Sequence, residues 1–230
     1  MHVVPEYKKI RLKFSKLGAL KFISHLDLDR TMKSAITRSG VKIEYTHGYN
    51  PRPHLVFSLP AALGIGSVCE FLDIKAADIT PDDVKDRLND ALPPDLRIIE
   101  AYEPESDFRQ IATSAYIITA ISPDIGDGTP DQIKEMFKKP VVIEKRTKKT
   151  ESGTMPFDIS PYVVVKYCEF DKVKLTLGVN AAASNSVYIN PEYIVKAICS
   201  ELSIDMTDPN TSLYTVLRTE VFFENGQLFR

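Results

Sequence analysis

Hydrophobic and polar positions in the first part of the chain follow first a strand period and then a helix period. Apolar and basic residues alternate over 10–14, which is typical of a strand with one buried face and one wet, positive face. Ser24 and Asp27 have the spacing of a capping box, and Gly40 is placed to end the helix that follows. The apolar residues that share one face of this helix are Leu28, Met32, Ala35 and Ile36.

The pattern continues to a complete β-α-β-β-α-β series. Thr80 followed by Pro81 predicts the N-cap and first position of a second helix, which runs to about Leu92. Three further strands are predicted over 42–45, 68–74 and 96–102. This order of elements is the ferredoxin-like pattern.

The second half of the chain repeats this order. Thr129 is the predicted N-cap of a short helix to Lys138, and Asn190 opens a helix to about Leu202. Strands are predicted over 115–121, 140–144, 162–168, 173–179 and 214–223.

The predicted fold class is therefore α+β, with two tandem ferredoxin-like domains over 1–106 and 107–230. The two domains are expected to join near 104–110. The second domain is expected to carry an extra strand and a mobile segment over 147–156.

The charge of the chain is unevenly distributed, although its net value is only −2 and its composition is that of an ordinary soluble protein. Residues 7–52 hold eleven Lys or Arg against three acidic residues, a balance of +8. Residues 78–107 hold three Lys or Arg against ten acidic residues, a balance of −7. A basic half favours a polyanionic partner. The alternative is a solvated surface that its acidic neighbour balances.

The cysteines indicate neither a metal site nor a cofactor. Cys69, Cys168 and Cys199 are isolated, and no spacing typical of an iron–sulfur cluster or structural zinc is present. Unpaired thiols suit a reducing cytoplasm. Residues 1–9 lack the apolar core of a signal peptide, and no apolar run is long enough for a membrane span. We therefore expect a cytoplasmic protein with no cofactor and no membrane partner.

Three of the four histidines lie between residues 22 and 60. His25 falls at the first helical position, where backbone N–H groups favour an anion, and imidazole can act as a general acid or base near neutral pH. Local packing of His25 is the alternative. His47 and His54 flank a loop stiffened by prolines. Imidazoles suit zinc, but the spacing of the three histidines matches no metal signature, so no metal is predicted.

Basic and aromatic residues surround these histidines and make a collective case for RNA binding. Arginine binds phosphate through a fork of donors, and tyrosine rings stack on unpaired bases. A rigid loop over a basic helix would hold a single strand or a hairpin. The alternative is a packed loop with Tyr49 in the core. The predicted RNA-binding residues are Arg30, Lys33, Arg38, Tyr45, Tyr49 and Arg52.

A second basic run begins at Lys138 and Lys139 and continues over 145–149. This run extends the RNA-binding prediction into the second half of the chain. A solvated surface is the alternative, because exposed lysine runs commonly have no ligand.

Two motifs give the chain a family resemblance. Residues 11–30 read RLKFSKLGALKFISHLDLDR, and residues 45–67 read YTHGYNPRPHLVFSLPAALGIGS. With the acidic and apolar run that begins at Glu70, they resemble the bacterial radical-SAM-linked proteins, a family of uncharacterised domains found beside or fused to radical-SAM enzymes. The resemblance implies a role alongside a radical-SAM protein. Because the chain has no CxxxCxxC, the radical chemistry would belong to that partner.

A more distant similarity is to the ferredoxin-like endoribonucleases that process CRISPR transcripts. Those enzymes combine a histidine near the first helix with a glycine-rich loop close to the C-terminus. His25 has a comparable place, whereas residues 221–229 hold one glycine, which departs from that pattern.

Three functions remain open from the sequence. The first is an RNA-binding accessory protein that presents RNA to a radical-SAM enzyme. The second is a metal-independent endoribonuclease with His25 as general base, His47 or His54 as acid, and Arg52 at the phosphate. The third is a protein-binding adaptor of the radical-SAM partner.

Overall fold

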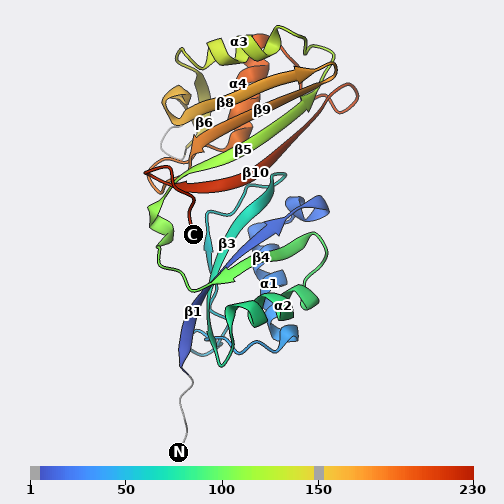
Figure 1. The fold of residues 1–230 in the computed structure, drawn as a ribbon. Coiled ribbons are helices and arrows are strands. Elements are labelled where there is room, and N and C mark those ends of the chain that lie inside the picture. Colours follow the sequence, from blue (N-terminus) through green and yellow to red (C-terminus); the bar gives the residue numbers. More distant parts are fainter. Residues whose placement is uncertain (1–5, 148–152) are drawn as a thin grey trace, which may run out of the picture. The chain divides into compact units, whose positions relative to one another are not determined.

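The computed structural model describes residues 6–147 and 153–230, and the chain divides into two compact units. Unit 1 contains residues 1–108 together with Arg230, and unit 2 contains residues 109–229. Both units mix α-helices with antiparallel strands, so the fold is α+β (Figure 1).

Unit 1 has a four-stranded antiparallel sheet in the order β4-β1-β3-β2. Its strands are β1 Tyr7–Lys16, β2 Val56–Ser58, β3 Gly66–Ala77 and β4 Leu96–Tyr102. Its helices are α1 His25–Ser39 and α2 Pro81–Ala91, preceded by the short 3-10 helix η1 Gly18–Phe22.

Helix α1 begins and ends where its sequence predicts. The Ser24 side chain accepts a hydrogen bond from the Asp27 backbone N–H at 3.1 Å and donates one to the Asp27 carboxylate at 2.7 Å. Gly40 ends the helix with φ of 68°, in the left-handed region that favours glycine. The four predicted apolar residues of its inner face are all buried.

The core of unit 1 lies between the sheet and its two helices. Alternate residues of β1, namely Ile10, Leu12 and Phe14, pack with Leu72 and Ile74 of β3 and with the apolar face of α1. Val84 and Leu88 of α2 complete this cluster. Because side chains alternate along a strand, the odd-numbered residues of β1 lie on the opposite face of the sheet.

Arg11 on that opposite face is fully buried, which corrects the prediction that the basic residues of 10–14 are wet. Its guanidinium holds the Asp73 carboxylate through two hydrogen bonds of 2.7 and 2.9 Å. It also donates to the Ser106 hydroxyl at 2.7 Å, and its Cζ lies 4.2 Å from the centre of the Phe108 ring. Residues 106–108 thus bind to the sheet through a charge that no hydrophobicity pattern reveals.

Unit 2 has a sheet in the order β10-β5-β9-β8 and a separate hairpin. The sheet strands are β5 Ile111–Ile121, β8 Val163–Asp171, β9 Lys174–Ala182 and β10 Leu213–Phe223. The hairpin strands are β6 Val142–Arg146 and β7 Thr154–Asp158, and the helices are α3 Thr129–Met136 and α4 Pro191–Leu202. The short 3-10 helices η2 Phe108–Gln110 and η3 Ser160–Tyr162 precede β5 and β8.

The structure corrects three local predictions. The stretch 42–45 forms isolated bridges at Ile43 and Tyr45, and the short strand of this region is β2. The N-cap of α3 is Gly128, because the Thr129 hydroxyl accepts instead from the Gly126 backbone N–H at 3.0 Å. The region after α3 carries two inserted strands rather than one.

The segment over 147–156 that was predicted to be mobile lies partly outside the described residues. Residues 148–152 are not described. Thr154 and the two residues after it belong to β7, which pairs with β6. The mobility of the segment stays a prediction, and its last three residues belong to a paired strand.

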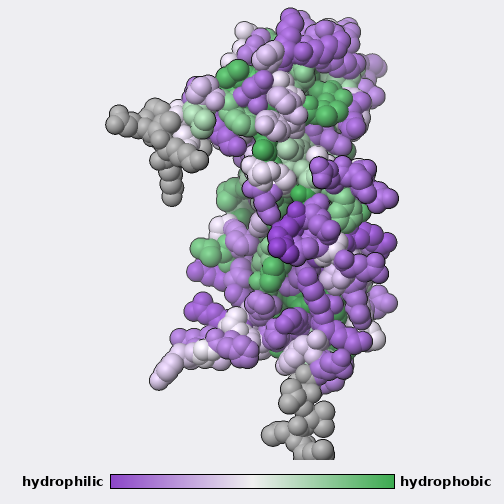
Figure 2. Space-filling model, turned by 90° about the vertical axis from the view of Figure 1, so that its left-hand side faces the viewer, coloured by the Kyte–Doolittle hydropathy of each residue, from purple (hydrophilic) through white to green (hydrophobic). Residues whose placement is uncertain are grey.

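The surface is largely polar on the face that Figure 2 shows. Hydrophilic residues cover most of that face, and hydrophobic residues form small patches between them (Figure 2). In the described part of the chain, no helix has both the length and the apolar character needed to cross a membrane.

The Arg11–Asp73 pair makes a testable contribution to the stability of unit 1. Asp73→Asn leaves the Arg11 charge buried without its counter-charge, so we expect the free energy of unfolding to fall by about 3–5 kcal/mol. Lys8→Met removes an exposed pair with Glu103 and should cost at most about 1 kcal/mol. Urea denaturation followed by circular dichroism measures both, and equal small losses would contradict the assignment.

Candidate nucleic-acid interface

The basic residues predicted on α1 lie on its solvent side, where each has a polar partner. Arg30 contacts the Asp27 carboxylate at 3.0 Å, and Lys33 contacts Asp29 at 2.6 Å. Arg38 donates to the backbone carbonyl of Ala91 at 2.6 Å and to the Ser34 hydroxyl. The hydrogen bonds from Ser24 and then Arg30 lower the pKa of Asp27. The Arg30–Asp27 and Lys33–Asp29 pairs reduce the positive field of the helix.

Both arginines of α1 line one hollow of about 590 Å³ between α1 and the end of α2. Arg30 and Arg38 supply guanidinium groups, and Thr31 and Ser34 supply hydroxyls from the same helix. Ala91, Leu92 and Pro93 form the other wall. Neither a carboxylate residue nor Lys33 lines this hollow. The Thr31 hydroxyl already donates to the Asp27 backbone carbonyl at 2.7 Å, so the donors suited to an anion are the two guanidinium groups and the Ser34 hydroxyl.

The loop between α1 and β2 is closed by backbone hydrogen bonds. The Thr46 N–H donates to the Arg52 carbonyl at 2.8 Å, and the His54 N–H donates to the Glu44 carbonyl at 3.0 Å. The Arg52 N–H donates to the Thr46 hydroxyl at 3.1 Å. Gly48 has φ of 132°, which few residues other than glycine adopt. The loop is therefore fixed at its base, and its tip is free to contact a ligand.

The residues at the tip of this loop, over 45–52, are exposed to solvent. Tyr49 is fully exposed, at 105% of its reference area, and this excludes the alternative that it fills the core. Tyr45 is 46% exposed, and Arg52 is exposed. Large aromatic rings held in water on a loop with a fixed base are suited to stacking on a flat ligand.

The three histidines have different immediate neighbours. The His25 ring lies edge-on to Phe57, with centroids 5.1 Å apart and planes at 86°, and His47 is exposed in the loop. The Nδ1 atom of His54 is 3.6 Å from the Glu44 carboxylate. Among the described residues, no three His, Cys, Asp or Glu side chains form a group that could hold a metal ion.

Glu44 is a residue of this site that the sequence reasoning missed. Its carboxylate lies 2.9 Å from the Lys75 ammonium and also faces His54, so it joins β3 to the end of the loop. The hydrogen bond from Lys75, followed by the charges of Lys75 and His54, holds the pKa of Glu44 below its ordinary value. No signal in the sequence connects Glu44 with Lys75, which lies 31 positions away.

In the second basic run, the structure describes the lysines at positions 138, 139 and 145. Lys138 pairs with Glu135, and the Lys145 ammonium lies 4.5 Å from the centre of the Phe157 ring. Lys148 and Lys149 lie outside the described residues. Lys138 and Lys145 thus have partners within unit 2.

Comparison with known proteins identifies the family. The chain belongs to the family described as "Uncharacterized protein conserved in bacteria (DUF2344)", whose model matches residues 9–191. Among curated proteins, none matches this chain.

One similar solved structure supports the fold alone. A chain in the crystal structure of a Cbf5-Nop10-Gar1 complex is 11% identical, with a TM-score of 0.50. The match covers 94% of this chain and 50% of that one, so this chain spans about half the length of the chain that it resembles. The structure of an unknown protein from Galdieria sulphuraria is 12% identical, with a TM-score of 0.25 over 93% of this chain and 99% of that one.

The Glu44 contacts predict a measurable titration. In the native protein the Glu44 pKa should lie below its ordinary value, and Lys75→Met should raise it. The stabilisation from these contacts is present above the ordinary pKa of Glu44 and is lost as the pH falls through its lowered pKa. Carboxyl NMR titration measures the shift. Lys42→Met, which removes an exposed pair with Asp78, is the control, and an ordinary Glu44 pKa in the native protein would refute the account.

Proposed function

We propose that this protein is an RNA-binding accessory protein that acts with a radical-SAM enzyme in RNA modification or processing. The observation that carries the proposal is the hollow beside α1, in which Arg30 and Arg38 accompany two hydroxyls and no carboxylate. Guanidinium forks bind phosphate oxygens in pairs. Arg30 and Arg38 are eight residues apart, about 12 Å along a helix, which allows contacts to more than one phosphate.

The loop supplies the second half of the proposed site. Tyr49 and Tyr45 would stack on bases, and Arg52 would contact the backbone between them. A ring that reaches into solvent can stack only on bases that are already unpaired, so the preferred substrate is single-stranded RNA or a hairpin loop. RNA binding would therefore combine electrostatic attraction at the hollow with base stacking at the loop.

The carboxylates beside α1 are compatible with this role. Arg30 and Asp27 are 74% and 52% exposed at their side chains, so water screens their attraction. A polyanion offers Arg30 more negative charge than one carboxylate does. Lys33 and Asp29, at 28% and 24% exposed, are better shielded from solvent, and Lys33 is expected to contribute less to binding than Arg30.

We further infer that each half of the chain is a ferredoxin-like domain, over 1–106 and 107–230. When only the four strands of each unit's sheet are counted in chain order, the first strand lies between the third and the fourth, and the second lies at the edge. The radical-SAM partner and a cytoplasmic location are parts of the same proposal. Their support is the resemblance of the FISHLDL and GYNPRPH motifs and the isolated cysteines, which leave any cluster to the partner.

RNA affinity tests the assignment. Arg38→Ala and Arg52→Ala should each weaken binding of a labelled hairpin RNA and lower the slope of log affinity against log salt by about 1. Arg87→Ala, on the acidic helix α2, is the control with the same charge change. Filter binding at several salt concentrations measures the slopes. Unchanged affinity and slope in both variants would exclude this interface.

The same experiment distinguishes the remaining functions. Tyr49→Ala should weaken binding, whereas Tyr49→Phe should retain it, because stacking needs the ring and not the hydroxyl. Recovered RNA that is shortened, and that stays intact with His25→Ala, would replace the accessory role by an endoribonuclease. No binding at low salt would favour the protein-binding adaptor.

A further inference from the structure

Ser34 lies between the two arginines of the hollow beside α1. Arg30, Ser34 and Arg38 follow one another at intervals of four residues, so they form one stripe of the helix, and all three line the hollow. The proposed function assigns a phosphate to each guanidinium. Because phosphates and riboses alternate along a nucleic-acid strand, a side chain between two phosphate-binding groups faces a ribose.

The Ser34 hydroxyl keeps a hydrogen that it can donate to a ligand. Thr31 and Thr37, on the same helix, each donate to the backbone carbonyl four residues earlier, at 2.7 and 2.9 Å. The Ser34 oxygen instead accepts a hydrogen bond from Arg38, and in the part of the chain that the structure describes no acceptor takes its hydrogen. Ser34 is exposed, so a ligand in the hollow can reach this donor.

An acceptor lies next to this donor. Arg38 donates through Nη1 to the Ser34 hydroxyl and through Nη2 to the Ala91 carbonyl at 2.6 Å. Both oxygens bond to one guanidinium, so they lie close together. Ala91 is the last residue of α2, where a carbonyl has no partner within the helix, and its second lone pair can accept another hydrogen bond. The hollow thus offers one donor and one acceptor side by side.

We propose that Ser34 and the Ala91 carbonyl bind a ribose 2′-hydroxyl and make this site prefer RNA to DNA. The inference rests on the proposed RNA-binding function and adds the group that distinguishes the two nucleic acids. A 2′-hydroxyl accepts from Ser34 and donates to the Ala91 carbonyl, since it is both an acceptor and a donor. A deoxyribose lacks this group and leaves both protein atoms without that partner.

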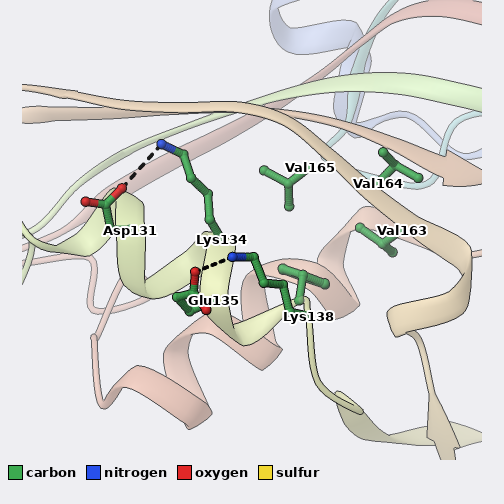
Figure 3. A pocket seen from close by; sticks show the side chains of 8 residues that line it. Asp131, Lys134, Glu135, Lys138, Val163, Val164 and Val165 are labelled. Carbon is green, nitrogen blue, oxygen red and sulfur yellow. Dashed lines mark hydrogen bonds and ion pairs between the residues drawn. The ribbon is translucent and has the colours of Figure 1, made fainter.

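A hollow of about 640 Å³ beside α3 lacks this arrangement (Figure 3). Lys134 and Lys138 line it together with Asp131 and Glu135, and each lysine pairs with one of these carboxylates. The described residues that line it include no serine or threonine. This hollow therefore offers neither an excess of positive charge for a phosphate nor a hydroxyl for a ribose.

The probes are fluorescein-labelled oligouridylate and its 2′-deoxy counterpart, which differ only in the 2′-hydroxyl. Fluorescence anisotropy should show that the protein binds the ribo form more tightly. Ser34→Ala should weaken the ribo form about fivefold and leave the deoxy form unchanged, because one hydrogen bond is lost. Alanine favours a helix, so this exposed substitution should leave α1 folded.

Two further variants separate the ribose contact from other effects. Thr37→Ala removes an exposed hydroxyl of the same helix outside the hollow, and it should change neither affinity. Arg30→Ala should weaken both oligonucleotides by the same factor, because the phosphates are common to both.

The outcome that would overturn the proposal is a ribo preference that is absent from the unchanged protein or that survives in Ser34→Ala. An equal loss for both oligonucleotides in Ser34→Ala would also overturn it, since a ribose contact cannot weaken the deoxy form. Hairpin RNA in the same assay tests the proposed function separately. A bound hairpin without a ribo preference refutes the 2′-hydroxyl assignment alone, whereas no binding of either RNA at low salt refutes the proposed function as well.

Discussion

The buried pair between Arg11 and Asp73 is the constraint that organises unit 1. A charge removed from water must be held by a counter-charge and by hydrogen bonds, and Arg11 receives both from Asp73 and Ser106. This requirement fixes β1 against β3 and brings residues 106–108 onto the sheet. With that face of the sheet engaged by the buried charge, the exposed basic groups and rings of the proposed RNA site lie on α1 and its following loop.

The site combines rigidity at its base with exposure at its tip. Backbone hydrogen bonds close the loop after α1, and Glu44 anchors its end through Lys75 and His54. Tyr49 is fully exposed to water, so its ring contributes nothing to the hydrophobic core. Because the base of the loop is fixed before a ligand arrives, the loop loses less conformational entropy when it binds.

Local signals in the sequence predicted the parts of the structure that depend on neighbouring residues. The N-cap at Ser24, the glycine end at Gly40 and the N-cap at Asn190 were confirmed because each acts within one helical turn. The capping box was confirmed in part, since the Asp27 carboxylate accepts from the Ser24 hydroxyl. Arg11 was wrongly predicted to be exposed. Alternation assigns a residue to one face of a strand, but it cannot show which later segment covers that face. For the same reason the role of Glu44 was missed, and the bridges at 42–45 were mistaken for a strand.

The central claim is that RNA contacts the loop after α1 and the basic side of that helix. Ultraviolet crosslinking of the full chain to a uridine-rich hairpin, followed by mass spectrometry of the crosslinked peptides, tests it most directly. If RNA binds there, crosslinks should form at Tyr45 or Tyr49, because both rings are exposed where bases would stack. Crosslinks that fall only in unit 2, with none in residues 25–54, would contradict it.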